Sequence, residues 1–102
     1  MYEGFEILTR DTLEFWSNYL VKAEVTIDGE VHEYPIFKKR IEGNRIRFLI
    51  YVTGNKGNVT EVTVYNRHNE PVRVLQSNLD KGEDGLMTVL SWTLEVKEEI
   101  RL

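Results

Sequence analysis

Most of the chain shows the two-residue alternation of apolar and polar positions that is typical of β-strands. After the N-terminal stretch, alternating runs are separated by turn signals, of which Asp28-Gly29 is a strong hairpin signal. The run 45–53 has apolar side chains at every second position and further apolar bulk on its other face, which predicts a central strand. The run Leu86–Val96 has the same two-sided character. We therefore predict a β-rich region over about residues 22–98.

A helical period precedes these strands. Leu13, Trp16 and Leu20 recur at near-helical spacing, and Phe15 and Tyr19 widen the apolar stripe. The Asp-x-x-Glu spacing at the start of this stretch resembles a capping box and places both acids where the helix dipole favours negative charge. The pattern predicts one helix over about residues 11–21. Its five apolar side chains form a candidate interaction surface, and the alternative, which we favour for most of them, is that they close one side of the sheet core.

These elements together predict an α+β, mainly β fold, an antiparallel β-sandwich or meander of about six strands with one N-terminal helix. A chain of 102 residues is long enough for one core and too short for two, so residues 1–102 are expected to form a single domain. Apolar bulk on both faces of two strands favours a second layer or an oligomer interface. The pattern leaves open which of these two covers them.

The composition limits the classes of partner and the cellular compartments that we expect for this protein. The net charge of −4 opposes a phosphate backbone, which favours protein or small-molecule partners and predicts no nucleic-acid binding. The chain has no cysteine, which excludes disulfides, iron–sulfur clusters and thiolate zinc sites and suits a reducing compartment. No window holds the roughly 20 apolar residues that span a membrane, and the start lacks a signal-peptide pattern. We expect a cytoplasmic protein when it is synthesised.

The densest positive charge is the run Lys38-Lys39-Arg40, which Phe37 and Arg45 could extend into a patch for phosphate or an acidic partner. A solvated loop is the favoured interpretation of these three residues.

No motif predicts catalysis, a cofactor or a metal. His32 and His68 lie near turns with no ligand spacing, and we interpret them as solvated surface histidines. The acidic stretch Asp80–Gly85 does not match the spaced ligands of a calcium loop and is interpreted as a polar turn within the longer polar stretch 77–85. We predict that the protein is not an enzyme and needs no cofactor.

Three segments carry a resemblance in layout to a known class of proteins. They are the turn-then-strand run Gly57–Asn66, the run Pro71–Val74 after a polar turn, and the closing run Gly85–Glu99. In this layout the chain from about Lys22 onward resembles small β-rich proteins and N-terminal domains of bacteriophage tails and tail fibres, including the tail-collar type. The resemblance implies a non-enzymatic structural part that docks on other virion components, as an oligomer and without a cofactor.

The leading prediction is therefore a structural or adaptor protein of a phage or prophage particle, which would place it in the virion. The alternative is a small ligand- or carbohydrate-binding β-sandwich that uses its aromatic residues and polar loops. A third hypothesis is an acidic regulator or inhibitor that presents carboxylates such as Glu95, Glu98 and Glu99 to a basic host protein.

Overall fold

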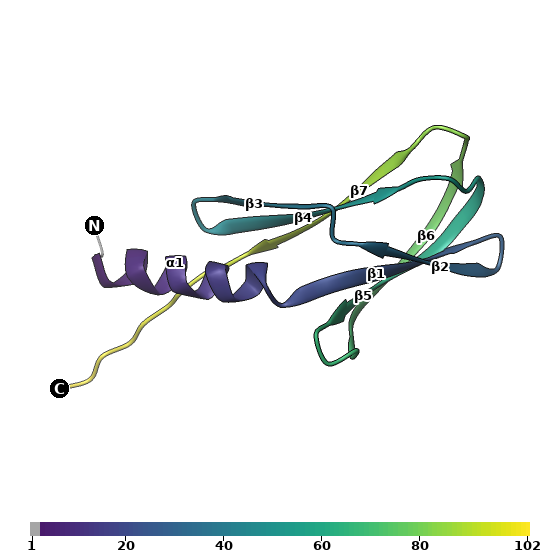
Figure 1. Cartoon of the computed structure of the whole chain (residues 1–102). Coiled ribbons are helices and arrows are strands. Elements are labelled where there is room, and N and C mark those ends of the chain that lie inside the picture. Colours follow the sequence, from purple (N-terminus) through teal and green to yellow (C-terminus); the bar gives the residue numbers. More distant parts are fainter. Residues whose placement is uncertain (1–2) are drawn as a thin grey trace.

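The computed structural model describes residues 3–102, which form one helix followed by seven strands (Figure 1). The elements are α1 (Glu3–Ser17), β1 (Leu20–Ile27), β2 (Glu30–Pro35), β3 (Lys38–Glu42), β4 (Arg45–Val52), β5 (Gly57–Asn66), β6 (Pro71–Lys81) and β7 (Leu86–Thr93). Every strand pairing is antiparallel, in one sheet of order β2-β1-β5-β6 and another of order β3-β4-β7. The predicted mainly β, α+β class is confirmed, and the strands form two sheets.

The strand that the pattern did not reveal is β3. Its residues Lys38–Glu42 were interpreted in part as a solvated loop, but they pair with β4 across the turn at Gly43, where φ is +59°. All five side chains of β3 are exposed, so the strand has no apolar alternation for a sequence pattern to detect. The Lys38-Lys39-Arg40 run therefore lies on a sheet, where neighbouring strands fix its positions.

The polar stretch 77–85 also contains more strand than predicted. β6 continues to Lys81, and only the residues between Lys81 and β7 form a loop. Side chains hold this part of the edge strand in place: the Asn58 amide nitrogen donates to Asn78 Oδ1 and to Asp80 Oδ1, both at 3.0 Å. The Lys81 amine is buried and donates to the carbonyls of Asn55 and Gly82.

Helix α1 begins at Glu3 and ends at Ser17, which corrects the predicted bounds of 11–21. The predicted cap at Asp11 lies inside the helix. At the C-terminal end, the Ser17 hydroxyl and the Asn18 amide both donate to the carbonyl of Glu14, which satisfies an orphan helix acceptor. The apolar stripe runs past the helix end because Leu20 is already in β1 and faces the same core.

The core lies between the two sheets. Ile46, Phe48, Ile50 and Val52 of β4 are fully buried, as the alternation of the run 45–53 predicts. They face the buried side chains of the four-stranded sheet, among them Ala23, Val25, Ile27, Val62 and Val64, and these residues form one cluster. The two-layer arrangement accounts for the apolar side chains on the inner face of β4, whereas the second layer does not cover Leu49, Tyr51, Met87 and Val89 on the outer face of the three-stranded sheet.

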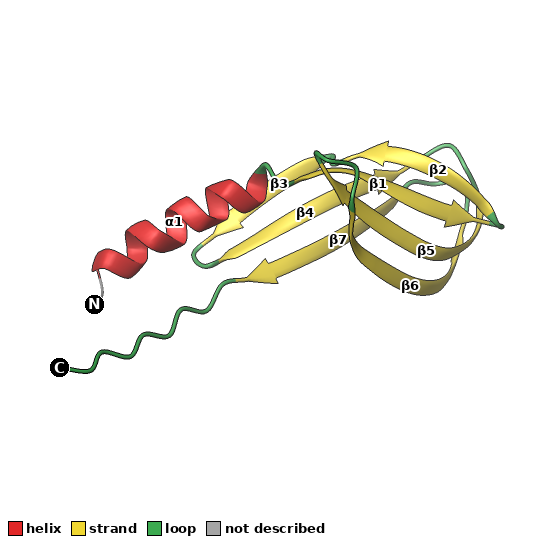
Figure 2. Ribbon diagram, turned by 90° about the horizontal axis from the view of Figure 1, so that it is seen from below, coloured by secondary structure: helices red, strands yellow, loops and turns green. Residues whose placement is uncertain are grey.

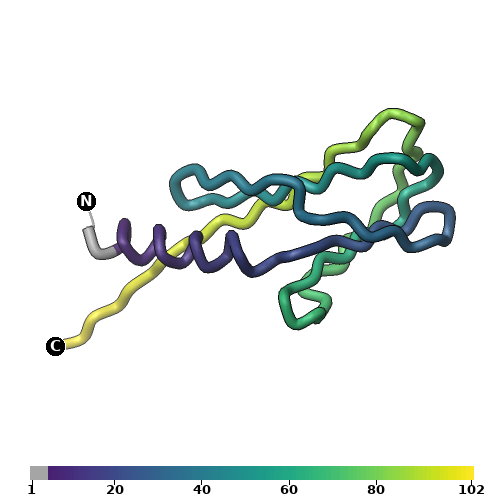
Figure 3. Tube along the Cα trace, viewed as in Figure 1, coloured from purple at the N-terminus to yellow at the C-terminus, as the bar shows by residue number. Residues whose placement is uncertain are grey.

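The molecule is elongated, with extents of 58 × 24 × 22 Å. Its radius of gyration of 16.6 Å exceeds the roughly 13 Å of a compact domain of this length. The cause is visible in Figures 2 and 3, where α1 and the residues after β7 project beyond the sheets at the same end. We call residues 94–102 the C-terminal arm. No helix among the described residues is long and apolar enough to span a membrane.

Candidate functional site

The outer face of the three-stranded sheet gathers cations and exposed apolar side chains. Alternate residues of β4 are buried in the core, so Arg45, Arg47, Leu49 and Tyr51 point outward. Directly paired residues of neighbouring strands share a face, and the register adds residues of β3 and β7 to this one. We define the basic face as Phe37, Lys38, Arg40, Arg45, Arg47, Leu49, Tyr51, Met87 and Val89.

The charge of this face is opposite to that of the chain. Lys38, Arg40, Arg45 and Arg47 face one carboxylate, Glu42, which gives the face a charge of +3 (4 − 1) within a chain of net charge −4. The carboxylate of Glu42 accepts from Arg47 Nη1 at 3.1 Å. Three cations are thus left over on a single surface.

Two of the four cations on the basic face oppose each other directly. Arg40 and Arg47 form a cross-strand pair on the exposed side of β3 and β4. Like charges at directly opposed positions destabilise a sheet, because each raises the electrostatic energy of the other. An anion that lies across the two guanidinium groups would relieve this repulsion.

The apolar part of the face is equally exposed. Phe37 is 58% exposed and Val89 is 51% exposed, and the rings of Phe37 and Tyr51 lie with their centroids 5.7 Å apart. The backbone nitrogen of Phe37 donates to the carbonyl of Leu49 at 2.8 Å, which holds this residue against β4. Between Phe37 and Val89 lies a shallow groove of about 450 Å³, which three of the cations also line. Aromatic and arginine side chains are both enriched in protein–protein interfaces.

The opposite face of the sandwich is acidic. On the outer side of the four-stranded sheet, Glu24, Glu33 and Glu61 stand against Lys22, which pairs with Glu33 at 3.2 Å. The Tyr65 hydroxyl donates to Glu24 Oε1 at 2.6 Å, and this hydrogen bond is the main cause that raises the pKa of Tyr65 above 10.0. The two outer faces therefore differ in the sign of their charge.

The structure divides the candidate surface predicted on the helix. Leu13 and Leu20 are fully buried, and Trp16 and Tyr19 are half-buried against the core. The rings of Trp16 and Trp92 meet edge to face with centroids 5.6 Å apart. Phe15 alone of the five is exposed, at 60%. The alternative interpretation, in which the stripe closes the sheet core, therefore describes the other four.

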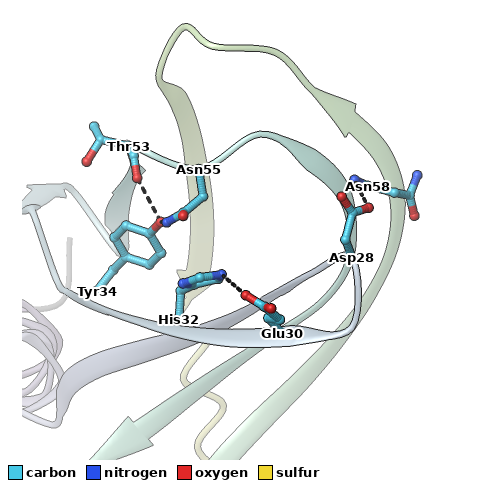
Figure 4. Close-up of polar contacts among 7 residues, drawn as sticks. All are labelled: Asp28, Glu30, His32, Tyr34, Thr53, Asn55 and Asn58. Carbon is cyan, nitrogen blue, oxygen red and sulfur yellow. Dashed lines mark hydrogen bonds and ion pairs between the residues drawn. The ribbon is translucent and has the colours of Figure 1, made fainter.

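The end of the sandwich opposite α1 carries a group of polar contacts (Figure 4). The Tyr34 hydroxyl donates to the carbonyl of Thr53 at 2.9 Å and accepts from Asn55 Nδ2 at 3.1 Å. On the other side of this end, the backbone nitrogen of Asn58 donates to Asp28 Oδ1 at 2.9 Å. These contacts hold the β1–β2 hairpin against the β4–β5 loop and the start of β5. The polar groups at this end therefore have a structural role.

The residues considered for metal chemistry are scattered. His68 is exposed, as predicted, whereas His32 is half-buried with Nε2 3.8 Å from Glu30 Oε2. In the acidic loop, Asp80 binds the Asn58 amide and Glu83 pairs with Lys56 at 3.6 Å, so the carboxylates do not converge. Within residues 3–102, no group of three His, Cys, Asp or Glu side chains could hold a metal ion.

The sequence identified part of the basic face and missed the rest. The Lys38–Arg40 run and its neighbours Phe37 and Arg45 were singled out, and the structure brings Lys38, Arg40 and Arg45 onto one face with Phe37 beside them. The sequence pattern does not link Arg47, Tyr51, Met87 and Val89 to the basic run, although these four residues lie at alternate positions of predicted strands.

Comparisons with protein-family models, with curated proteins and with solved structures find no match to this chain.

Proposed function

We propose that this chain is a non-enzymatic structural or adaptor domain that binds an acidic segment of a partner protein on its basic face. The observation that carries the proposal is the direct opposition of Arg40 and Arg47 on an exposed sheet face. Glu42 relieves their repulsion only at Arg47, and the cost that remains in the free protein is one that a bound carboxylate converts into attraction.

A protein partner fits this face better than a nucleic acid does. Half of the basic face is apolar, with Phe37, Met87 and Val89 exposed, and such a mixture suits a segment that alternates acidic and apolar side chains. The partner we propose is an acidic, partly apolar protein segment.

The phage or prophage setting of this function rests on the sequence resemblance described above. In that setting the partner would be another virion component of the tail, baseplate or fibre attachment. The basic face indicates the chemistry of the partner, and the resemblance indicates the kind of particle in which the partner would be found.

The two alternatives have less support in the geometry. A carbohydrate platform needs exposed flat rings, whereas Trp16 and Trp92 pack on each other and on the core. The exposed rings of Phe37 and Tyr51 are inclined to each other by 54° and form no flat platform. An acidic mimic needs an excess of carboxylates, whereas Lys97 and Arg101 lie beside Glu95 and Glu99, at 3.5 and 2.8 Å, and only Glu98 of the three candidate carboxylates makes no ion pair within the described chain.

The proposal predicts that charge reversal on the basic face abolishes binding of an acidic peptide. The probe is a labelled peptide that alternates glutamate with leucine and phenylalanine, measured by fluorescence anisotropy at 50 and 300 mM salt. We expect Arg40→Glu/Arg47→Glu to weaken binding about tenfold or more, and salt to weaken binding to the unaltered protein, because the attraction is electrostatic.

The matched control is Arg67→Glu/Arg73→Glu, which makes the same charge change at exposed positions near the β5–β6 turn. It should leave the affinity for the peptide within about twofold. Absence of peptide binding, or an equal loss in both double variants, would contradict the proposal. Tighter binding of an oligothymidine of similar charge would identify the face as a nucleic-acid site instead.

A further inference from the structure

Most of the C-terminal arm has no neighbouring strand paired with it in the described chain. The nitrogen of Leu94 donates to the carbonyl of Asn44 at 2.8 Å, and the Asn44 amide donates back to the carbonyl of Leu94 at 2.9 Å. After this contact, residues 95–102 make no backbone hydrogen bond to the rest of the described chain. The arm nevertheless runs on in extended form from β7 (Figure 2). An extended segment with free backbone groups is a template for pairing with another strand.

The two faces of the arm differ in chemistry. Leu94, Val96, Ile100 and Leu102 continue the side of β7 on which Trp92 packs against Trp16 and Phe48. Leu94 packs against the core, whereas Ile100 is 69% exposed and Leu102 is fully exposed, so the apolar side lacks cover toward the end of the arm. The other side carries only charged residues, which are Glu95, Lys97, Glu99 and Arg101.

We propose that two copies of this chain associate by antiparallel pairing of their C-terminal arms about a twofold axis at Glu98. This register places Leu94 opposite Leu102 and Val96 opposite Ile100 on the apolar side. On the charged side it places Glu95 opposite Arg101 and Lys97 opposite Glu99, and the symmetry repeats each pair. Opposite charges and apolar side chains at directly opposed positions both stabilise a pair of strands.

Nearby registers lack this complementarity. Parallel pairing in register sets each charged residue opposite itself. A shift of two residues sets either Glu95 opposite Glu99 or Lys97 opposite Arg101. A shift of one residue places apolar side chains opposite charged ones. A shift of four residues in either direction keeps only one kind of ion pair, Glu95 with Lys97 or Glu99 with Arg101, and sets Glu98 opposite an apolar residue.

The backbone of the arm points in the direction that this register needs. Leu94 uses its backbone groups on Asn44, so Leu94 and the even-numbered residues that follow it direct theirs to the β4 side. The odd-numbered residues direct theirs to the free edge. About an axis at Glu98, the pairs of odd-numbered residues are the ones that exchange hydrogen bonds, as in any antiparallel ladder. The backbone direction thus excludes every register shifted by an odd number of residues, and the charge pairing selects this register among the rest.

One feature of the register opposes association. The two Glu98 side chains meet each other at the axis, on the otherwise apolar side, and like charges there repel. The interaction is therefore expected to be weak in the unaltered protein. Glu98→Val removes the repulsion and should tighten the dimer by about tenfold or more, because it also extends the apolar row.

The test exchanges charges within the arm of the full chain and follows the mass by sedimentation equilibrium. Glu95→Arg places arginine opposite Arg101, and Arg101→Glu places glutamate opposite Glu95, so each variant alone should dimerise about tenfold more weakly. A mixture of the two variants restores opposite charges at both positions and should associate at least as tightly as the unaltered protein. The double variant Glu95→Arg/Arg101→Glu should recover as well.

The exchanged side chains are exposed and lie outside the core, so folding of each variant can be verified by circular dichroism. Arg67→Glu, on the β5–β6 turn, is the control for net charge and should not change the mass. A monomer at all concentrations for both the unaltered protein and Glu98→Val would overturn the proposal. So would a mixture that associates no better than the separate variants. The outcome is independent of peptide binding to the basic face, which uses other residues.

Discussion

The hydrogen bond from Tyr65 to Glu24 makes the stability of the sandwich depend on alkaline pH. The contact of 2.6 Å holds the phenol in its neutral form, and it raises the pKa of Tyr65 above 10.0 in the folded protein. Because the pKa of Tyr65 is higher in the folded than in the unfolded protein, this tyrosine stabilises the fold, and its contribution is fully present at pH values below the pKa of the unfolded state. That contribution is lost as pH rises from about 10 through the folded pKa.

We therefore expect the difference in unfolding free energy between the unaltered protein and Tyr65→Phe to be largest near neutral pH and to shrink above pH 10. Urea denaturation at a series of pH values from 7 to 11 measures it. Tyr51→Phe, which removes a phenol from the other sheet, serves as the comparison. A difference between the unaltered protein and Tyr65→Phe that stays constant across this range would refute the assignment.

Gly85 is the residue that leaves room for the aromatic part of the basic face. A Cβ atom at this position would collide with the ring of Tyr51, so Gly85→Ala forces that ring to move. We expect the substitution to weaken binding of the acidic peptide several-fold while the protein stays folded, because the ring belongs to an exposed side chain. Gly82→Ala, where a Cβ atom meets nothing within 4 Å, is the matched control. Equal binding by the two variants would exclude Tyr51 from the interaction.

At the scale of elements, α1 offers a direct comparison of a core and a surface position. Leu13 is fully buried and Phe15 is 60% exposed, two residues apart on one helix. Leu13→Ala should lower the free energy of unfolding by about 2–5 kcal/mol, because it removes buried methyl groups and leaves a cavity. Phe15→Ala should change it by about 0.5 kcal/mol or less. Urea denaturation of both variants decides whether the helix is part of the core, and similar losses in both would contradict the observed packing.

The elements that could be predicted from the sequence are those whose burial alternates. β4 has an apolar residue at every second position, and the predicted run 45–53 matches its bounds to one residue. β7 has Thr88 among its apolar positions, and the predicted run Leu86–Val96 begins correctly but ends three residues beyond Thr93. β3 and the end of β6 expose most of their side chains, and they form because a neighbouring strand supplies hydrogen bonds. The first half of α1 was missed because the predicted cap at Asp11 proved to be an exposed interior residue. Pairing partners far away in sequence are invisible to a local pattern.

The candidate site was only partly predictable for the same reason. The Lys38–Arg40 run is a local feature, so its charge was apparent before its structure was known. Its opposition to Arg47 depends on the register of β3 and β4, and the contribution of Val89 depends on β7, which comes from the far end of the chain. A surface that three strands share can be predicted only once the order of the strands in the sheet is known.

At the scale of the whole molecule, the elongated outline has two separate origins. The sandwich itself brings the two sheets together around one core, whereas α1 and the C-terminal arm extend its length at one end (Figure 1). The basic face lies on the sandwich, and the pairing edge lies on the arm. The proposed binding of a partner and the proposed association of two copies therefore use different parts of the molecule and can occur together.

The opposite charge of the two outer faces has a consequence beyond the residues that compose them. Positive charge on one outer face of the sandwich and negative charge on the other make an electric dipole that runs across the molecule, from one sheet to the other. In the field of a charged partner such a dipole experiences a torque before any contact forms, so the molecule turns its basic face toward an acidic target during approach. A chain that carries an excess of negative charge can in this way be captured by negatively charged protein without first reversing its overall sign.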